Sequence, residues 1–167
     1  MIKAEQIKSI LNLRPHPEEG GYYAETYRSS EMISAAALPN RYGGARSIST
    51  AIYYLLTPGA FSVMHRLGSD EIFHFYLGDP IEMVQLWPDG SGKLVTLGTD
   101  IANGMRLQEI VPAGVWQGCA LRLGGKFGLV GTTVAPGFEL ADYETGSREA
   151  LIGLYPRYEE RIRALTR

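Results

Sequence analysis

Two ionisable side chains interrupt apolar, strand-like stretches on either side of a short turn at 68–70. Because alternate side chains of a strand share a face, we expect His65 to point into the core with Leu67, and Glu71 with Phe73. Burying an imidazole and a carboxylate costs several kcal/mol unless the groups are paired, hydrogen-bonded or bound to a ligand. We therefore expect His65 and Glu71 on adjacent strands, either as an internal hydrogen-bonded pair or as the floor of a ligand pocket.

An imidazole beside a carboxylate is suited to acid–base catalysis. Removal of a proton next to a carbonyl group needs a base poised near neutral pH and a donor that steadies the enolate. We assign the base to His65, and to Glu71 the orientation of its ring. The donor is a tyrosine, with Tyr53 as the first choice and Tyr54 and Tyr143 as alternatives that also line the pocket.

Further ligand-binding candidates come from a strand at 22–28, in which Glu25 and Arg28 fall on opposite faces. Periodicity does not decide which face is internal. His74, three residues after Glu71, has the opposite strand parity, so it lines the pocket only if a bulge intervenes. Otherwise His74 is a hydrogen-bonded histidine between the strands and a covering segment.

Trp116 and Gln117 complete the set of candidate ligand-binding residues. They begin a strand that follows a turn, and Trp116 is either a core residue or an aromatic wall for a sugar ring.

The elements that position these residues are mainly short strands. Turn residues rich in Gly, Pro, Asp and Ser separate the segments, and this spacing is typical of an all-β sandwich or barrel. The predicted strands lie at 22–28, 47–56, 61–65, 71–77, 82–87, 93–97, 108–111, 116–123 and 127–134. Amphipathic patterns predict short helices near the two ends, at 3–13 and 155–165.

Two segments lack regular patterning. Residues 30–45 form a long link, which we interpret as a flexible loop. Residues 135–146 are rich in carboxylates and either fold over one mouth of the barrel or remain a solvated loop.

Composition limits the possible functions. The chain has 167 residues, 45% of them hydrophobic, which fits a single domain over 1–167. A net charge of -2 offers no field for nucleic acid or anionic membrane, and no apolar stretch approaches a membrane span. The single cysteine, Cys119, forbids an intramolecular disulfide and is predicted to be a buried strand residue. We expect a cytoplasmic protein with a small-molecule partner.

Motifs for other chemistry are missing from the sequence. It has no phosphate-binding Gly-Lys-Ser/Thr loop, no Gly-x-Ser-x-Gly elbow, and no paired cysteines for a structural zinc site.

The spacing of Gly59, His65, Glu71 and Gly78 resembles the first motif of the cupin superfamily. The run 112–117 is similar to the second motif, with Gln117 in the place of its histidine. Leu67 likewise stands where the first motif has its second histidine.

More narrowly, the chain resembles a little-characterised cupin family. The shared features are a His16-Pro-Glu-Glu-Gly-Gly opening with one extra glutamate, a Tyr-x-Glu-Thr-Tyr-Arg strand, the His65 to Glu71 spacing, and Ala135-Pro-Gly-Phe. The resemblance covers about residues 11–154. It implies a double-stranded β-helix (cupin jelly-roll) barrel, commonly dimeric, and similarity to sugar-nucleotide epimerases of the dehydrorhamnose type.

From the resemblance we expect a homodimer and an epimerase or isomerase for a sugar-like or sugar-nucleotide ligand; the alternative is a binding protein without turnover. Metal-binding cupins present three histidines and a glutamate. The matching residues here offer one histidine and one carboxylate, so we predict metal-independent chemistry without a cofactor.

Overall fold

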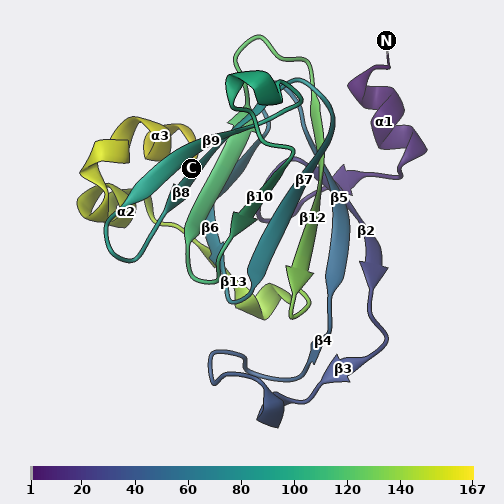
Figure 1. The fold of residues 1–167 in the computed structure, drawn as a ribbon, viewed down its shortest axis with the longest axis vertical. Coiled ribbons are helices and arrows are strands. Elements are labelled where there is room, and N and C mark those ends of the chain that lie inside the picture. The colour runs from purple at the N-terminus through teal and green to yellow at the C-terminus, as the bar shows by residue number, and fades with distance from the viewer. Residues whose placement is uncertain (1) are drawn as a thin grey trace.

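Two antiparallel β-sheets packed face to face form the body of the protein, and the computed structural model describes residues 2–167 (Figure 1). In spatial order the six-stranded sheet contains β1 (Arg14–Pro15), β2 (Tyr22–Arg28), β5 (Thr50–Leu56), β12 (Gly128–Ala135), β7 (Asp70–Gly78) and β10 (Gln108–Val111). The five-stranded sheet contains β13 (Tyr143–Thr145), β6 (Phe61–Leu67), β11 (Trp116–Leu121), β8 (Ile81–Leu86) and β9 (Gly92–Leu97). The predicted all-β jelly roll is confirmed.

The core lies between the two sheets. Because successive side chains of a strand point to opposite faces, every second residue points into this space, as Phe73 and Phe75 of β7 do. Each such side chain contributes about 1.5–3 kcal/mol when fully buried. The other members of this cluster are Tyr54, Leu56, Ile81, Met83, Val95, Leu97, Val111, Val115, Cys119 and Val130. Cys119 is a buried strand residue, as predicted.

Helices cover the outer faces of both sheets (Figure 1). Ile7 of α1 (Ala4–Ile10) packs on the six-stranded sheet, while α2 (Arg148–Leu154) and α3 (Glu159–Ala164) pack on the five-stranded sheet. The predicted terminal helices are present but shorter than expected. Helix α2 was not predicted, and Ser147 caps its first turn by accepting a hydrogen bond from the Ala150 amide. Among residues 2–167 no helix has the length and apolarity needed to cross a membrane.

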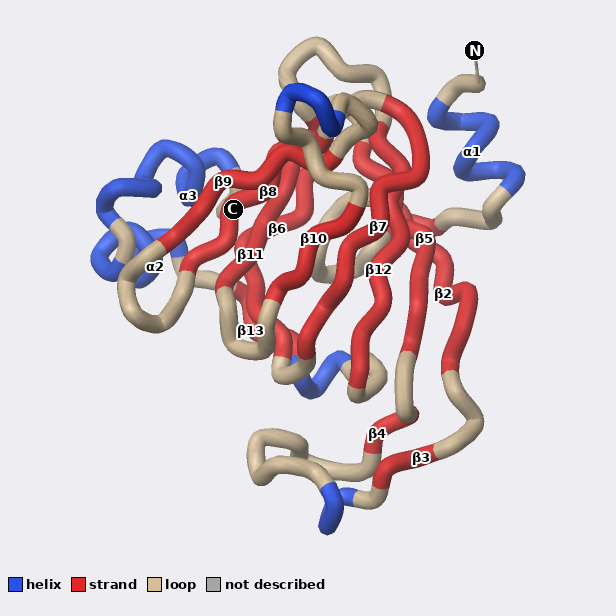
Figure 2. Tube along the Cα trace, in the orientation of Figure 1, coloured by secondary structure: helices blue, strands red, loops and turns tan. Residues whose placement is uncertain are grey.

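Two connecting segments are more ordered than the sequence suggested. The predicted strand 47–56 is broken at 48–49, because β4 (Arg46–Ser47) leaves the sandwich and pairs with β3 (Met32–Ile33). This hairpin and the 3₁₀ turn Ala35–Ala37 form an arm at the bottom of Figure 2. Residues 135–146 do fold over a mouth of the barrel, since Phe138 and Leu140 line a cavity there, and β13 at the end of the segment pairs with β6. The single domain and the homodimer stay predictions.

A buried ion pair fastens that covering segment to the arm. The Arg46 guanidinium donates to both carboxylate oxygens of Asp142, at 2.7 and 2.6 Å, and both side chains are 5% exposed. The third guanidinium nitrogen of Arg46, Nη1, donates to the carbonyl oxygens of Gly44 and Ala45. Such a fully hydrogen-bonded pair tolerates burial, but either partner alone would be an uncompensated charge.

We expect Asp142→Asn to destabilise the protein by about 3–5 kcal/mol, because it leaves the Arg46 charge buried without its partner. The matched control is Glu144→Gln, which breaks the exposed Arg66–Glu144 pair on the same segment and should cost less than about 1 kcal/mol. Urea denaturation measures both. Equal losses for the two variants would contradict the structural role of the Arg46–Asp142 pair.

Candidate functional site

A cavity of about 280 Å³ lies at one end of the barrel and brings His65 and Glu71 together. Its walls combine ionisable groups with apolar side chains from β2, β5, β6, β7 and β12. The lining residues are Arg14, His16, Pro17, Glu19, Tyr23, Glu25, Arg28, Thr50, Ala51, Ile52, His65, Leu67, Glu71, Thr132, Val134, Phe138 and Leu140.

His65 is held in one orientation by its own strand. Its Nδ1 lies 2.7 Å from the Val63 carbonyl oxygen, and since a carbonyl only accepts, Nδ1 carries the proton. The lone pair is therefore on Nε2. Tyr143 of β13 stacks on the imidazole with ring centroids 4.9 Å apart and an interplanar angle of 21°. Burial lowers the pKa of His65, against the opposing effect of Glu71, so the ring is a neutral base.

Glu71 reaches the cavity from the opposite sheet. The expectation that it lies on a strand adjacent to His65 was wrong, because the turn at 68–69 carries the chain from β6 in one sheet to β7 in the other. The Gln117 side-chain amide donates to the Glu71 carboxylate at 2.5 Å. Burial, reinforced by the nearby charge of Glu19, raises the pKa of Glu71 to about 6.

A row of polar side chains continues from Gln117 into the barrel interior. Gln117 on β11 stands opposite His65 on one side and Gln85 on the other, and Gln85 donates to Glu109 at 3.0 Å. Glu109 in turn accepts from Arg106 at 2.7 Å. The Oε1 atoms of Gln117 and Gln85 are buried without a hydrogen-bond partner among residues 2–167. The sequence analysis identified only Gln117 of this row.

Glu25 and Arg28 both line the cavity, although simple alternation placed them on opposite faces. The register of β2 against β5 shifts between Glu25 and Tyr27, so one extra residue changes the parity. Arg28 donates to Glu25 at 3.1 and 2.9 Å and to Glu139 at 2.8 Å. Two carboxylates therefore hold its guanidinium at the rim.

None of the three predicted tyrosines is among the residues that line the cavity, although Tyr143 stacks on His65. Tyr53 faces outward, where its ring packs edge-on against Tyr76 under α1, because it is one position away from the inward-facing Ile52. The prediction that Tyr53 is a catalytic residue of this cavity was therefore wrong. Tyr54 points inward but lies in the core, and its hydroxyl donates to the Gly20 carbonyl at 2.8 Å.

His74 and Trp116 also lie elsewhere. No bulge turns His74 inward: its ring nitrogens face Gln108 and Thr133 on the outer side of the sheet, at 3.2 and 3.3 Å. Trp116 packs against the C-terminal helices, with the Arg66 guanidinium 4.6 Å from its ring centre. Strand alternation explains both outward orientations, because His74 lies between the inward-facing Phe73 and Phe75 and Trp116 precedes the inward-facing Gln117.

Sequence reasoning missed His16 and Glu19, whose side chains are 9% and 14% exposed within the same cavity. They belong to the loop between β1 and β2. The available signal was the two glycines that follow: Gly20 and Gly21 have φ of 94° and 67°, and a Cβ at Gly21 would lie 2.8 Å from the Tyr54 hydroxyl. Such glycines mark a backbone forced into close contact, here over Tyr54.

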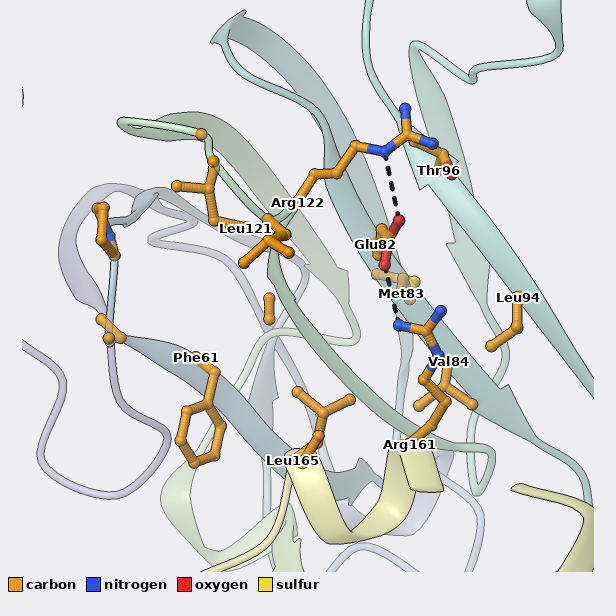
Figure 3. Close-up of a pocket in the computed structure, with 18 of the residues that line it drawn as sticks. Phe61, Glu82, Met83, Val84, Leu94, Thr96, Leu121, Arg122, Arg161 and Leu165 are labelled. Carbon is orange, nitrogen blue, oxygen red and sulfur yellow. Dashed lines mark hydrogen bonds and ion pairs between the residues drawn. The ribbon is translucent and has the colours of Figure 1, made fainter. Parts of the chain in front are cut away.

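A larger cavity of about 530 Å³ lies on the outer side of the five-stranded sheet beside α3 (Figure 3). Its one carboxylate is already paired, since Glu82 binds Arg161 at 2.9 Å and Arg122 at 3.4 Å. Neither a histidine nor an unpaired carboxylate lines it. The smaller cavity is therefore the candidate site on chemical grounds.

Comparisons with known proteins agree with this fold. The family model described as "Cupin superfamily (DUF985)" matches residues 5–146. The uncharacterized protein YML079W of Saccharomyces cerevisiae is 33% identical over 133 residues, covering 75% of this chain and 66% of that protein. The chain thus spans just under two thirds of the length of this curated relative.

Solved structures include close and distant matches. A hypothetical protein from Leishmania major is 33% identical with a TM-score of 0.89, and each chain is covered to 99%. Protein SO0799 from Shewanella oneidensis is 36% identical with a TM-score of 0.86, covering 100% of this chain and 99% of that one. An oxalate decarboxylase from Bacillus subtilis is 14% identical with a TM-score of 0.53, covering 92% of this chain and 37% of that one, which shows the fold alone.

The oxalate decarboxylase of Bacillus subtilis has Mn(II) centres, whereas the residues at the matching positions of this chain offer few metal donors. Leu67 has no donor atom, and the nitrogen of the Gln117 amide is directed at Glu71. Among residues 2–167 no group of three or more His, Cys, Asp and Glu side chains is placed to hold a metal ion. These residues do not fit a transition metal that needs three good protein ligands.

We expect Glu71→Gln to change stability in a pH-dependent way. The pKa of Glu71 is about 6 in the folded protein against an ordinary value of 4.5, so protonation stabilises the fold, and this stability is lost as pH rises through 6. Relative to wild type, the variant should be equally stable below pH 4.5 and up to about 2 kcal/mol more stable at pH 8.

Urea denaturation between pH 4 and pH 8 measures this difference. The exposed Glu18 on the β1–β2 loop supplies the control, and Glu18→Gln should follow the wild-type curve. A Glu71→Gln variant that is less stable than wild type by the same amount at every pH would contradict the raised pKa.

We expect the double variant Leu67→His, Gln117→His to bind zinc or manganese at about one ion per chain, because it adds two imidazoles beside His65 and Glu71. Elemental analysis of protein purified without tag or chelator measures the content. The single variant Gln117→His is the control and should bind more weakly. A full equivalent of metal in the wild-type protein would contradict the donor-set argument.

Proposed function

The chain belongs to the cupin superfamily, and on that premise we propose that its cavity catalyses proton transfer next to a carbonyl group of a small, sugar-like metabolite, as an isomerase or epimerase does. The observation that carries this proposal is the orientation of His65. Its Nδ1 proton is committed to the Val63 carbonyl, so the basic Nε2 of a neutral imidazole is left available in a cavity. A buried histidine with a purely structural role would have both nitrogens bonded.

The step itself needs only residues of this chain. His65 Nε2 takes the proton from carbon, and the electron pair of the C–H bond moves toward the carbonyl oxygen. The resulting imidazolium is stabilised by the carboxylate of Glu71, whose position the Gln117 amide fixes. The Tyr143 ring stacks on the imidazole and supports its orientation, but its hydroxyl is buried outside the cavity lining, so we do not assign it as the donor to the developing oxyanion.

The size of the cavity limits the ligand. About 280 Å³ is just below the range of roughly 300–1,000 Å³ that is usual for ligand pockets. A monosaccharide-sized compound fits this space, whereas a sugar nucleotide would have to leave its nucleotide outside. We therefore favour a free sugar or a sugar acid over the sugar-nucleotide ligand.

The second candidate function is small-ligand binding without turnover. The apolar wall of the cavity favours it, because Ile52, Leu67, Val134, Phe138 and Leu140 offer burial for a ligand but no chemistry. A binder would use the same polar groups only for orientation.

Solvent deuterium exchange distinguishes the two functions. We expect the protein to exchange a carbon-bound proton in a member of a panel of keto-sugars, sugar acids and sugar nucleotides in D₂O, followed by NMR. His65→Gln should lower the rate by about 10²–10⁴-fold, because it removes the base. The control is His74→Gln, which makes the same substitution at an outward-facing histidine and should leave the rate unchanged.

The outcome that favours a binder is equally specific. A panel compound that stabilises the protein in a thermal shift assay, by about 2.7 kcal/mol at 100 times its dissociation constant, but exchanges no proton would rule out the isomerase.

A further inference from the structure

The β1–β2 loop brings a second histidine and a second glutamate into the cavity, and the proton-transfer step above uses neither. His16 and Glu19 line the same 280 Å³ space as His65 and Glu71. Their side chains are 9% and 14% exposed, so each is mostly withdrawn from solvent at a point where an ionisable group is costly to bury.

The loop is fixed in place by contacts to β6. The Glu19 carbonyl accepts from the Val63 amide at 2.9 Å, and the Ser62 hydroxyl donates to Glu19 Oε1 at 2.6 Å. Val63 thus holds both units, because its amide binds Glu19 and its carbonyl binds His65. The positions of Glu19 and His65 are set by the same residue.

The two glycines of the loop make this seating possible. Gly20 and Gly21 adopt positive φ, and a Cβ on Gly20 would clash with the Phe61 carbonyl oxygen. The Gly20 carbonyl accepts from Tyr54. The conformation is therefore built into the sequence.

Within the loop, His16 and Glu19 form a pair. The Glu19 amide donates to His16 Nδ1 at 2.8 Å, so the neutral ring carries its proton on Nε2, which lies 3.9 Å from Glu19 Oε2. Oxygen Oε1 is already bound to Ser62, which leaves Oε2 as the atom available to a ligand. Burial raises the pKa of Glu19 and lowers that of His16.

We propose that Glu19, supported by His16, is a second catalytic acid–base residue, so that the cavity takes a proton from carbon with His65 and returns one with Glu19. This inference rests on the proposed function and makes it more specific: the reaction inverts one stereocentre next to a carbonyl group. An inversion of this kind uses two proton carriers on opposite faces of the carbon, so the proposal requires the ligand to bind between His65 Nε2 and Glu19 Oε2.

The step is balanced without a co-reactant. His65 gains the proton of the broken C–H bond, and the electron pair passes to the carbonyl oxygen. The pair then returns to carbon as Glu19 gives up its carboxyl proton to the opposite face, and water reprotonates Glu19 and deprotonates His65. Nothing is oxidised or reduced.

The test compares two measurements on one substrate from the deuterium-exchange panel. In Glu19→Gln we expect epimer formation to fall about 10²–10⁴-fold, while exchange of deuterium into recovered substrate stays within about tenfold of wild type, because His65 is intact. His65→Gln should lose both. The neighbouring Glu18→Gln is the matched control, since Glu18 is exposed outside the cavity, and it should change neither.

Each result has a distinct meaning. Partial recovery of epimer formation in Glu19→Asp, with wild-type melting temperature, supports a proton carrier over a structural role. Normal epimer formation in Glu19→Gln overturns this inference and leaves the proposed function standing. Absence of any exchange in the wild-type protein overturns the proposed function and this inference together.

Discussion

The hydrogen bond between the Gln117 amide and the Glu71 carboxylate joins the two sheets inside the barrel, and the site depends on it. Burying a carboxylate in an apolar interior costs free energy. The hydrogen bond from Gln117 and the nearby His65 together do not keep the pKa of Glu71 at its ordinary value. The raised pKa of Glu71 reflects the free-energy cost of burial that these contacts do not offset. The site is thus held in a state that takes up a proton readily.

This constraint explains why neighbouring elements carry polar residues into the core. Gln117 is positioned by Gln85 and His65 on either side in the same sheet, and Gln85 is tied to Glu109. Burial by itself would raise the pKa of Glu109, but the ion pairs with Lys93 and Arg106 outweigh it and lower that pKa. One end of the polar row is therefore charged and neutralised by cations, while the other end, at Glu71, is not. Catalytic capacity belongs at the uncompensated end.

Much of the fold could be predicted from the sequence, because alternation and turn residues act locally. The strand around His65 and the return strand from Glu71 were placed correctly on that basis. What alternation could not reveal was which strands pair: β6 and β7 are consecutive but lie in different sheets. The two side chains still meet, because inward-facing residues of opposite sheets share one interior.

The candidate site was only partly predictable for related reasons. Parity correctly indicated that His74 faces outward unless a bulge intervenes, and a bulge near Glu25 reversed the parity of Arg28. Bulges depend on contacts between strands, which are absent from a single strand's pattern. Tyr53 and Tyr54 were adjacent alternatives, and neither reaches the cavity, since one faces α1 and the other supports Gly20.

The loop residues were missed because loops carry no periodicity. His16 and Glu19 reach the cavity because Gly20 and Gly21 allow the loop backbone to adopt positive φ. The sequence signal for these two residues was therefore the glycine pair that follows them. The two His–Glu pairs, His65 with Glu71 and His16 with Glu19, are also held by different kinds of element. His65 is fixed by a strand in the sheet, whereas His16 and Glu19 are fixed by a loop seated on that strand at Ser62 and Val63. A ligand in the cavity therefore meets His65, which a strand of the barrel positions, and Glu19, which the β1–β2 loop positions. A few hydrogen bonds between that loop and β6 set the distance between them.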